Sequence, residues 1–213
     1  MWYPASVTVA ATGAPVSIDD VKLRLRIDAS DDQSDVQLMI AGATDYIEKY
    51  CNTRFATQTV AMKCDRFVDF AFLPEAPVQS VSDVTYVDTT GATQTLGTDV
   101  YDVRSDGLEA SIVLKYGQQW PAVQQGSRIT VTAVVGYETA PDAVKNAILL
   151  LVGGTYANRE PADLPAGARP IPGAIWVAGW STVDSLLSNY RRGAAYEETQ
   201  NGGYRNYRSV GYW

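Results

Sequence analysis

The sequence predicts an α+β protein in which an antiparallel β module is inserted between the second and third of about four helices. Apolar residues recur at helical spacing in residues 17–54 and 138–192, which we expect to form one helical domain. Residues 55–137 instead contain six or seven short strand-like segments separated by turn residues. Two terminal segments complete the chain: an extended arm over residues 1–16 and a tail over residues 193–213.

The first helical stretch contains two predicted helices. Ser17 suits the N-cap of a short helix, because two aspartates follow in its first turn. Ser34 suits the N-cap of a second helix over Asp35–Asn52. One face of this second helix should pack against the core, because its apolar residues form a stripe: Val36, Met39, Ile40, Ala43, Ile47 and Tyr50.

Turn residues divide the β module. Thr90-Gly91 and Asp106-Gly107 are each flanked by strand-like segments, which predicts two hairpins. Residues 57–64 and 66–73 are rich in residues that favour strands, and apolar residues alternate with polar ones in residues 127–135. We therefore expect each of these three segments to form a strand.

A long amphipathic helix is predicted over Thr139–Glu160, and five consecutive apolar residues surround its axis on every side. This apolar run is far shorter than the roughly 20 residues that span a bilayer. Other helices of the chain or a second copy must therefore cover it. Two glycines follow, which either admit a close neighbour or weaken the helix. The predicted subunit interface is Ile148, Leu149, Leu150, Leu151, Val152, Gly153 and Gly154.

The chain contains no histidine, which excludes Ser-His-Asp and Cys-His catalysis and histidine-ligated metals. Cys51 and Cys64 lack the spacing of a metal-binding pair, so we expect two free buried thiols in a reducing cytoplasm. Residues 28–35 resemble a calcium loop, but Gln33 and Met39 stand where glycine and glutamate are required. We therefore expect no catalytic centre, no cofactor and no metal site.

The net charge of -7 argues against a surface that grips nucleic acid through phosphate contacts. It suits a surface that DNA passes without sticking. The sequence shows neither a signal peptide nor a membrane span, so we expect a soluble globular protein.

The segment from Gly193 contains no Leu, Ile or Phe and cannot build a core of its own. It carries residue types that are frequent in interface hot spots: Tyr196, Tyr204, Arg205, Tyr207, Arg208, Tyr212 and Trp213. A flexible tail with incidental aromatic residues is one interpretation. A tail that orders against a partner is the interpretation that we favour.

Six fragments in order resemble the head–tail connector (adaptor) proteins of long-tailed bacteriophages and gene transfer agents: SIDDVKLRLRID, LMIAGATDYIEKYCNTRF, LPEAPVQSVSDVTYVD, QQWP, VVGY and PDAVKNAILLLVGGTYANRE. The likeness covers about residues 17–192 and leaves out the arm and the tail.

This resemblance implies a structural role at the head–tail junction of a virion or phage-like particle, after assembly in the bacterial host cytoplasm. Such proteins form a ring, typically of about twelve copies, beneath the portal protein. Tail-completion or tail-terminator proteins dock on the other face, and DNA passes through the hole without sequence-specific binding. The resemblance implies no catalytic centre and no cofactor.

Two other classes of function follow from the residues alone. A carbohydrate- or receptor-binding module could use an aromatic platform: Tyr86, Tyr101, Tyr116 and Trp120. A carboxylate-based hydrolase could use Asp65, Asp69 and Glu75. Aromatic residues in strands also serve ordinary cross-strand packing, and acidic residues also form an ordinary solvated face.

Overall fold

The structure is a computed structural model that describes residues 1–27, 33–157, 180–192, 196–198 and 204–206. It confirms the α+β class, with four α-helices and antiparallel sheets in the described part of the chain. The chain divides into two compact units. The sheet unit comprises Met1–Thr12, Asn52–Glu138 and Arg192–Trp213, and the helical unit comprises Gly13–Cys51 and Thr139–Arg191.

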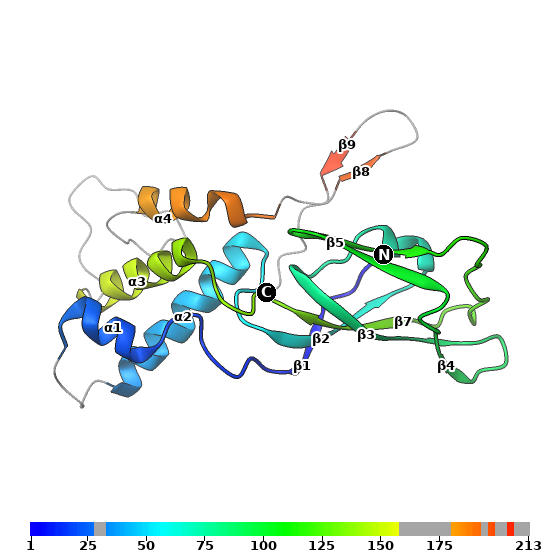
Figure 1. The fold of residues 1–213 in the computed structure, drawn as a ribbon, viewed down its shortest axis with the longest axis horizontal. Coiled ribbons are helices and arrows are strands. Elements are labelled where there is room, and N and C mark those ends of the chain that lie inside the picture. Colours follow the sequence, from blue (N-terminus) through cyan, green and yellow to red (C-terminus); the bar gives the residue numbers. More distant parts are fainter. Residues whose placement is uncertain (28–32, 158–179, 193–195, 199–203, 207–213) are drawn as a thin grey trace. The chain divides into compact units, whose positions relative to one another are not determined.

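The sheet unit contains a five-stranded antiparallel sheet in the order β1-β2-β7-β3-β4 (Figure 1). Its strands are β1 (Ser6–Val9), β2 (Gln58–Cys64), β3 (Val78–Val87), β4 (Thr93–Thr95) and β7 (Ile129–Val135). A separate hairpin pairs β5 (Tyr101–Asp106) with β6 (Glu109–Leu114). Both predicted hairpins are confirmed, because Thr90-Gly91 connects β3 to β4 and Asp106-Gly107 connects β5 to β6.

The central strand β7 shows the alternation that its sequence predicts. Ile129, Val131, Ala133 and Val135 are fully buried, and the residues between them are half-buried. Because β7 pairs with β2 on one side and β3 on the other, its buried face forms the middle of the core.

The first residues, expected as an extended arm, are extended and belong to the sheet unit. Ser6–Val9 forms β1 at one edge of the sheet. Trp2 lies against Phe70 with 6.0 Å between ring centroids, and its indole N–H donates to the Asp69 carbonyl oxygen at 2.9 Å.

The strand predicted over residues 66–73 is wrong, since Phe67–Ala71 forms a 3-10 helix, η1. A three-residue repeat places Phe67 and Phe70 on the same side of such a helix. Both side chains are buried, and Trp120 stacks on Phe67 at 4.7 Å and meets the edge of Phe70 at 5.5 Å. Aromatic packing therefore outweighs the strand propensity of this segment.

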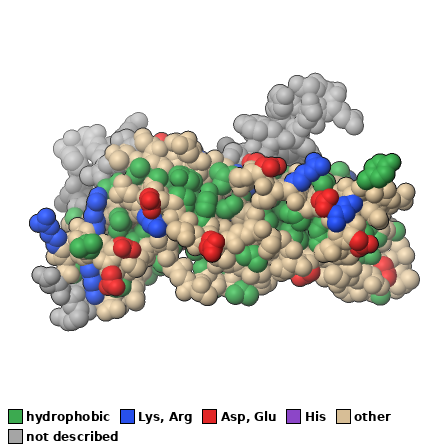
Figure 2. Space-filling view, in the orientation of Figure 1, with side chains coloured by type: hydrophobic (Ala, Val, Ile, Leu, Met, Phe, Trp, Pro, Cys, Tyr) green, Lys and Arg blue, Asp and Glu red, His purple; other side chains and the backbone are tan. Residues whose placement is uncertain are grey.

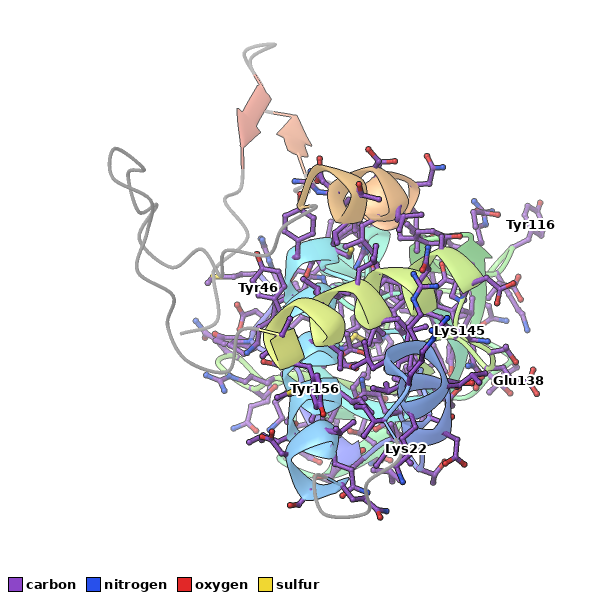
Figure 3. All side chains as sticks on the ribbon, turned by 90° about the vertical axis from the view of Figure 1, so that its left-hand side faces the viewer. Lys22, Tyr46, Tyr116, Glu138, Lys145 and Tyr156 are labelled. Carbon is purple, nitrogen blue, oxygen red and sulfur yellow. The ribbon has the colours of Figure 1, made fainter. Side chains whose placement is uncertain are left out.

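The helical unit contains α1 (Ile18–Leu25), α2 (Gln33–Cys51), α3 (Asp142–Ala157) and α4 (Trp180–Leu187), and α4 continues into the 3-10 helix η2 (Ser188–Tyr190). Helix α3 contacts the other three helices, and Figure 3 shows it crossing α2 beside α1. None of the helices that the structure describes has the length and hydropathy of a bilayer-spanning segment.

Ser17 caps α1 as predicted. Its hydroxyl accepts from the Asp20 backbone N–H at 3.1 Å, and the Asp20 carboxylate accepts from the Ser17 backbone N–H at 3.1 Å. The Ser17 hydroxyl also donates to the Asp20 carboxylate at 2.7 Å, and this bond, together with the one from the Ser17 backbone N–H, lowers the pKa of the Asp20 carboxyl group. Ser34, however, lies inside the first turn of α2 and is not its N-cap, because α2 begins at Gln33.

Gly136, directly after β7, has a backbone that only glycine fits. Its φ is +99°, and a Cβ at this position would lie 2.1 Å from the Ala56 carbonyl oxygen. The close approach also allows the Gly136 N–H to donate to the Pro77 carbonyl oxygen at 2.8 Å.

We predict that Gly136→Ala lowers the free energy of unfolding by more than about 3 kcal/mol, because backbone atoms must move to admit the methyl group. Gly126→Ala is the matched control, since Gly126 has a φ of +81° and open space around it. The control should cost about 1–2 kcal/mol, the cost of the left-handed backbone alone. Urea unfolding of both variants measures the difference, and equal losses would show that the Ala56 contact is unimportant.

Candidate interface sites

The predicted apolar band on α3 is mostly covered within one copy. Ile148 and Val152 are fully buried and Leu151 is 5% exposed, all inside the helical unit. Leu149 and Leu150 are half-buried. The chain itself therefore covers three of the five residues that we predicted to contact a second copy, and of these five only Leu149 and Leu150 retain surface for a neighbour.

The two glycines of the predicted interface lie within α3, which continues to Ala157, so they do not end the helix. A Cβ at Gly153 would lie 3.3 Å from Leu25 Cδ2 in α1. The close neighbour at Gly153 is thus another helix of the same chain. Gly154 is half-buried in the same turn.

Among the described residues of the helical unit, the most exposed leucines lie on other helices. Leu23 on α1 is 83% exposed and Leu38 on α2 is 71% exposed. Neither residue was predicted from the sequence to be part of an interface. Leu38 lies outside the apolar stripe of α2, so a search for apolar residues off the stripe would have found it.

The structure describes part of the predicted tail. Strands β8 (Tyr196–Glu198) and β9 (Tyr204–Asn206) pair antiparallel, so Tyr196, Tyr204 and Arg205 lie on one hairpin. The remaining predicted tail residues lie outside the described ranges: Tyr207, Arg208, Tyr212 and Trp213.

Arg192, four residues before β8, is buried in the sheet unit, and the sequence analysis missed it. Its guanidinium donates to the carbonyl oxygens of Pro74, at 2.5 Å, and Leu73. It also lies 4.2 Å from the centre of the Phe72 ring and 3.6 Å from the Glu109 carboxylate. Burial lowers the pKa of this guanidinium, and the neighbouring Glu109 carboxylate opposes that shift.

Residues Leu73–Pro77, which we call the strap, also bind the chain at two other points. Arg54 Nε donates to the Glu75 carboxylate at 2.8 Å, and the Arg54 backbone N–H donates to the Ala76 carbonyl oxygen at 2.8 Å. Pro77 accepts the bond from Gly136. Three stretches of chain distant in sequence are thus held by five consecutive residues.

The aromatic platform of the carbohydrate-binding hypothesis does not form. Tyr101 is 4% exposed in the core, and Trp120 and Tyr86 both pack on Phe67. Tyr116 is fully exposed and points away from the ribbon (Figure 3). A sugar needs several ring faces side by side, and these four residues offer one.

The three carboxylates of the hydrolase hypothesis have structural partners. The Tyr3 hydroxyl donates to Asp65 at 2.9 Å, the Arg66 backbone N–H donates to Asp69 at 3.2 Å, and Glu75 pairs with Arg54. Within the described ranges, no group of three Cys, Asp or Glu side chains could hold a metal ion. Charged residues of both signs are interspersed on the face that Figure 2 shows.

A family model described as "HCP: Head completion protein" matches residues 15–160. Among solved structures, the chain is similar to one from "Neck of empty GTA particle computed with C6 symmetry", with a TM-score of 0.70 and 18% identity over 91% of this chain and 97% of that one. A chain from "Neck of native GTA particle computed with C12 symmetry" has a TM-score of 0.63 and 17% identity over 91% and 97%. No curated protein matches.

The family match identifies the class of the protein as structural, a component of phage particles and not an enzyme. More specifically, the chain belongs to the head completion protein family. The resemblance inferred from the sequence motifs is thereby confirmed.

Both cysteines are free and buried, one in each unit. Burial raises the pKa of Cys51 and of Cys64 to about 12. At about pH 8 nearly all of both thiols are protonated, and the thiolate is the reactive form.

We predict that neither thiol of the folded protein reacts with a disulfide reagent at about pH 8, and that both react in concentrated guanidinium chloride. A Cys51→Ala variant assigns the remaining signal to Cys64 and so to the sheet unit. One equivalent of rapid reaction in the native protein would contradict the burial of that thiol.

Proposed function

We propose that this chain is a head–tail connector that forms a ring between the portal and the tail of a phage or phage-like particle. The observation that carries the proposal is the likeness over about nine-tenths of both chains to neck chains of gene transfer agent particles. Their titles name C6 and C12 symmetry, and a closed ring of identical copies is what cyclic symmetry describes. A ring of about twelve copies is consistent with the second title.

In this proposal the ring contact is heterologous, so each copy presents one surface to the next copy and a different surface to the previous one. Leu149 and Leu150 are the large apolar side chains of the predicted interface that keep surface for a neighbour. The helical unit then supplies at least one side of the ring contact.

The net charge of -7 supports a passage for DNA rather than a DNA-binding surface. A basic channel would hold the duplex through released counterions and would make its passage steeply dependent on salt. An acidic ring leaves the DNA free to move in both directions.

The C-terminal segment supplies the portal contact in this proposal. Its tyrosines and arginines are typical of interface hot spots, and a segment that gains order on binding can wrap its partner. Tail-completion or tail-terminator proteins then dock on the opposite face of the ring, once assembly in the host cytoplasm has placed the ring at the head–tail junction.

Electron microscopy of the purified chain, alone and mixed with portal particles, tests the proposal. We expect rings, either free or seated on the portal with a shared axis. Monomers that never associate with the portal at any concentration would contradict the proposed function.

We predict that the double variant Leu149→Gln and Leu150→Gln weakens ring formation and changes the free energy of unfolding by less than about 1 kcal/mol, because both side chains are half-exposed. Ile148→Ala is the control on the same helix. It should lower the free energy of unfolding by about 2–5 kcal/mol, since Ile148 is fully buried. Mass photometry and urea unfolding separate the two effects. Rings of undiminished stability in the double variant would exclude this face from the contact.

We predict that deletion of Asn201–Trp213 leaves the thermal midpoint unchanged and abolishes portal attachment, since these residues include most of the aromatic tail. Co-sedimentation with portal particles measures attachment. A truncated chain that still co-sediments would contradict the role proposed for the tail.

A further inference from the structure

Burial of the Arg192 guanidinium costs solvation free energy, and its partners compensate only part of that cost. Its side chain has no exposed surface, and its Nε has no hydrogen-bond partner. Among the described residues its ion-pair partner is Glu109, which lies 3.6 Å away and is 58% exposed, so this ion pair is weak. Replacing Arg192 alone would leave the Leu73 and Pro74 carbonyl oxygens without their donor, so it should also cost stability.

The contacts of Arg192 fix the position and the orientation of its guanidinium group on the sheet unit. The planar guanidinium binds two adjacent carbonyl oxygens, those of Leu73 and Pro74, while its face lies over Phe72. Lysine cannot reproduce this arrangement, because an ammonium group has neither the planar fork nor the stacking face.

The preceding residue is held as well, within the helical unit. Arg191 lies 4.5 Å from the centre of the Tyr50 ring and 3.5 Å from the Asp184 carboxylate, to which the Tyr50 hydroxyl also donates. Two consecutive arginines are thus fixed immediately before the C-terminal segment begins.

We infer that Arg192 is a positioning residue, which fixes the point on the sheet unit from which the C-terminal segment reaches the portal. The inference rests on the proposed portal role of that segment. A tethered segment with a fixed origin has a higher effective concentration at its binding site and loses less conformational entropy when it binds. Arg192 therefore contributes to attachment in addition to its contribution to the stability of the sheet unit.

Three variants test the inference. Arg192→Met keeps an unbranched side chain and removes the charge, and Arg192→Lys keeps the charge and removes the planar fork. Arg24→Met is the matched control, because Arg24 is an exposed arginine on α1 and its loss changes the net charge equally. For each variant, the urea midpoint and the dissociation constant for portal particles are measured.

We expect both Arg192 variants to lower the urea midpoint, because the Leu73 and Pro74 carbonyl oxygens lose their donor, to remain folded in the absence of urea, and to bind portal particles at least tenfold more weakly. The Arg24 variant should match the wild type in both. Wild-type affinity in Arg192→Met would overturn the inference. Gly126→Ala is a second control, because it lowers the stability of the sheet unit and leaves the contacts of Arg192 intact. Equal weakening of portal binding in that variant would also overturn the inference, because lost stability alone would then explain the effect.

A measurement without portal separates this inference from the proposed function. Spin labels at Thr93→Cys and Glu198→Cys, in β4 and β8, report the distance between the sheet and the start of the segment, and the native thiols are buried. We expect Arg192→Met to broaden the distance distribution. An equally broad distribution in the wild type would overturn the inference. If deleting residues 201–213 leaves portal affinity unchanged, the portal role fails, and this distance measurement still decides whether Arg192 fixes the segment.

Discussion

The sheet unit depends on the hydrogen bonds that the strap, Leu73–Pro77, makes with distant parts of the chain. Glu75 is 8% exposed and holds Arg54 through two oxygens, with N···O distances of 2.8 and 3.4 Å. A carboxylate so deeply buried is stable only with its partner, and removing one member of such a pair leaves an uncompensated charge. The strap also accepts hydrogen bonds from the Arg192 guanidinium, at the carbonyl oxygens of Leu73 and Pro74. The segments that enter and leave the sheet unit are therefore fixed at one place.

This constraint explains why the recognisable motifs of the chain are structural. LPEAPV contains the strap, and VVGY contains Gly136, which only a residue without a Cβ can occupy beside Ala56. The tryptophan of QQWP stacks on Phe67 in the core. These fragments identify the family because they specify its fold.

Local patterns in the sequence predict local structure well in this chain. The glycine turns at Thr90-Gly91 and Asp106-Gly107 and the alternation in β7 depend on neighbouring residues only, and the structure confirms them. The prediction of a strand at residues 66–73 was wrong because this segment forms a 3-10 helix that packs against Trp120, about fifty residues away in the sequence. The prediction that the apolar band of α3 contacts a second copy fails for three residues for the same reason, because distant parts of the chain, the other helices of the unit, cover them.

The buried Arg192 shows a further limit of prediction from the sequence. Arg192 stands in a run of polar residues near the end of a helix, and a basic residue there has an ordinary explanation in the helix dipole. Only the three-dimensional arrangement places it on two carbonyl oxygens more than a hundred residues away. The position of a buried charge is set by long-range contacts, which composition and periodicity do not contain.

Native-state hydrogen exchange tests the central role of the strap most directly. Three backbone N–H groups report on it: Arg54 donates to Ala76, Leu73 donates to Ala110, and Gly136 donates to Pro77, each at 2.8 Å. If the strap holds the sheet unit together, these amides should exchange as slowly as those of β7, through unfolding of the whole unit. Exchange at the rate of the exposed Asp88–Ala92 turn would show that the strap opens independently, and would contradict the account.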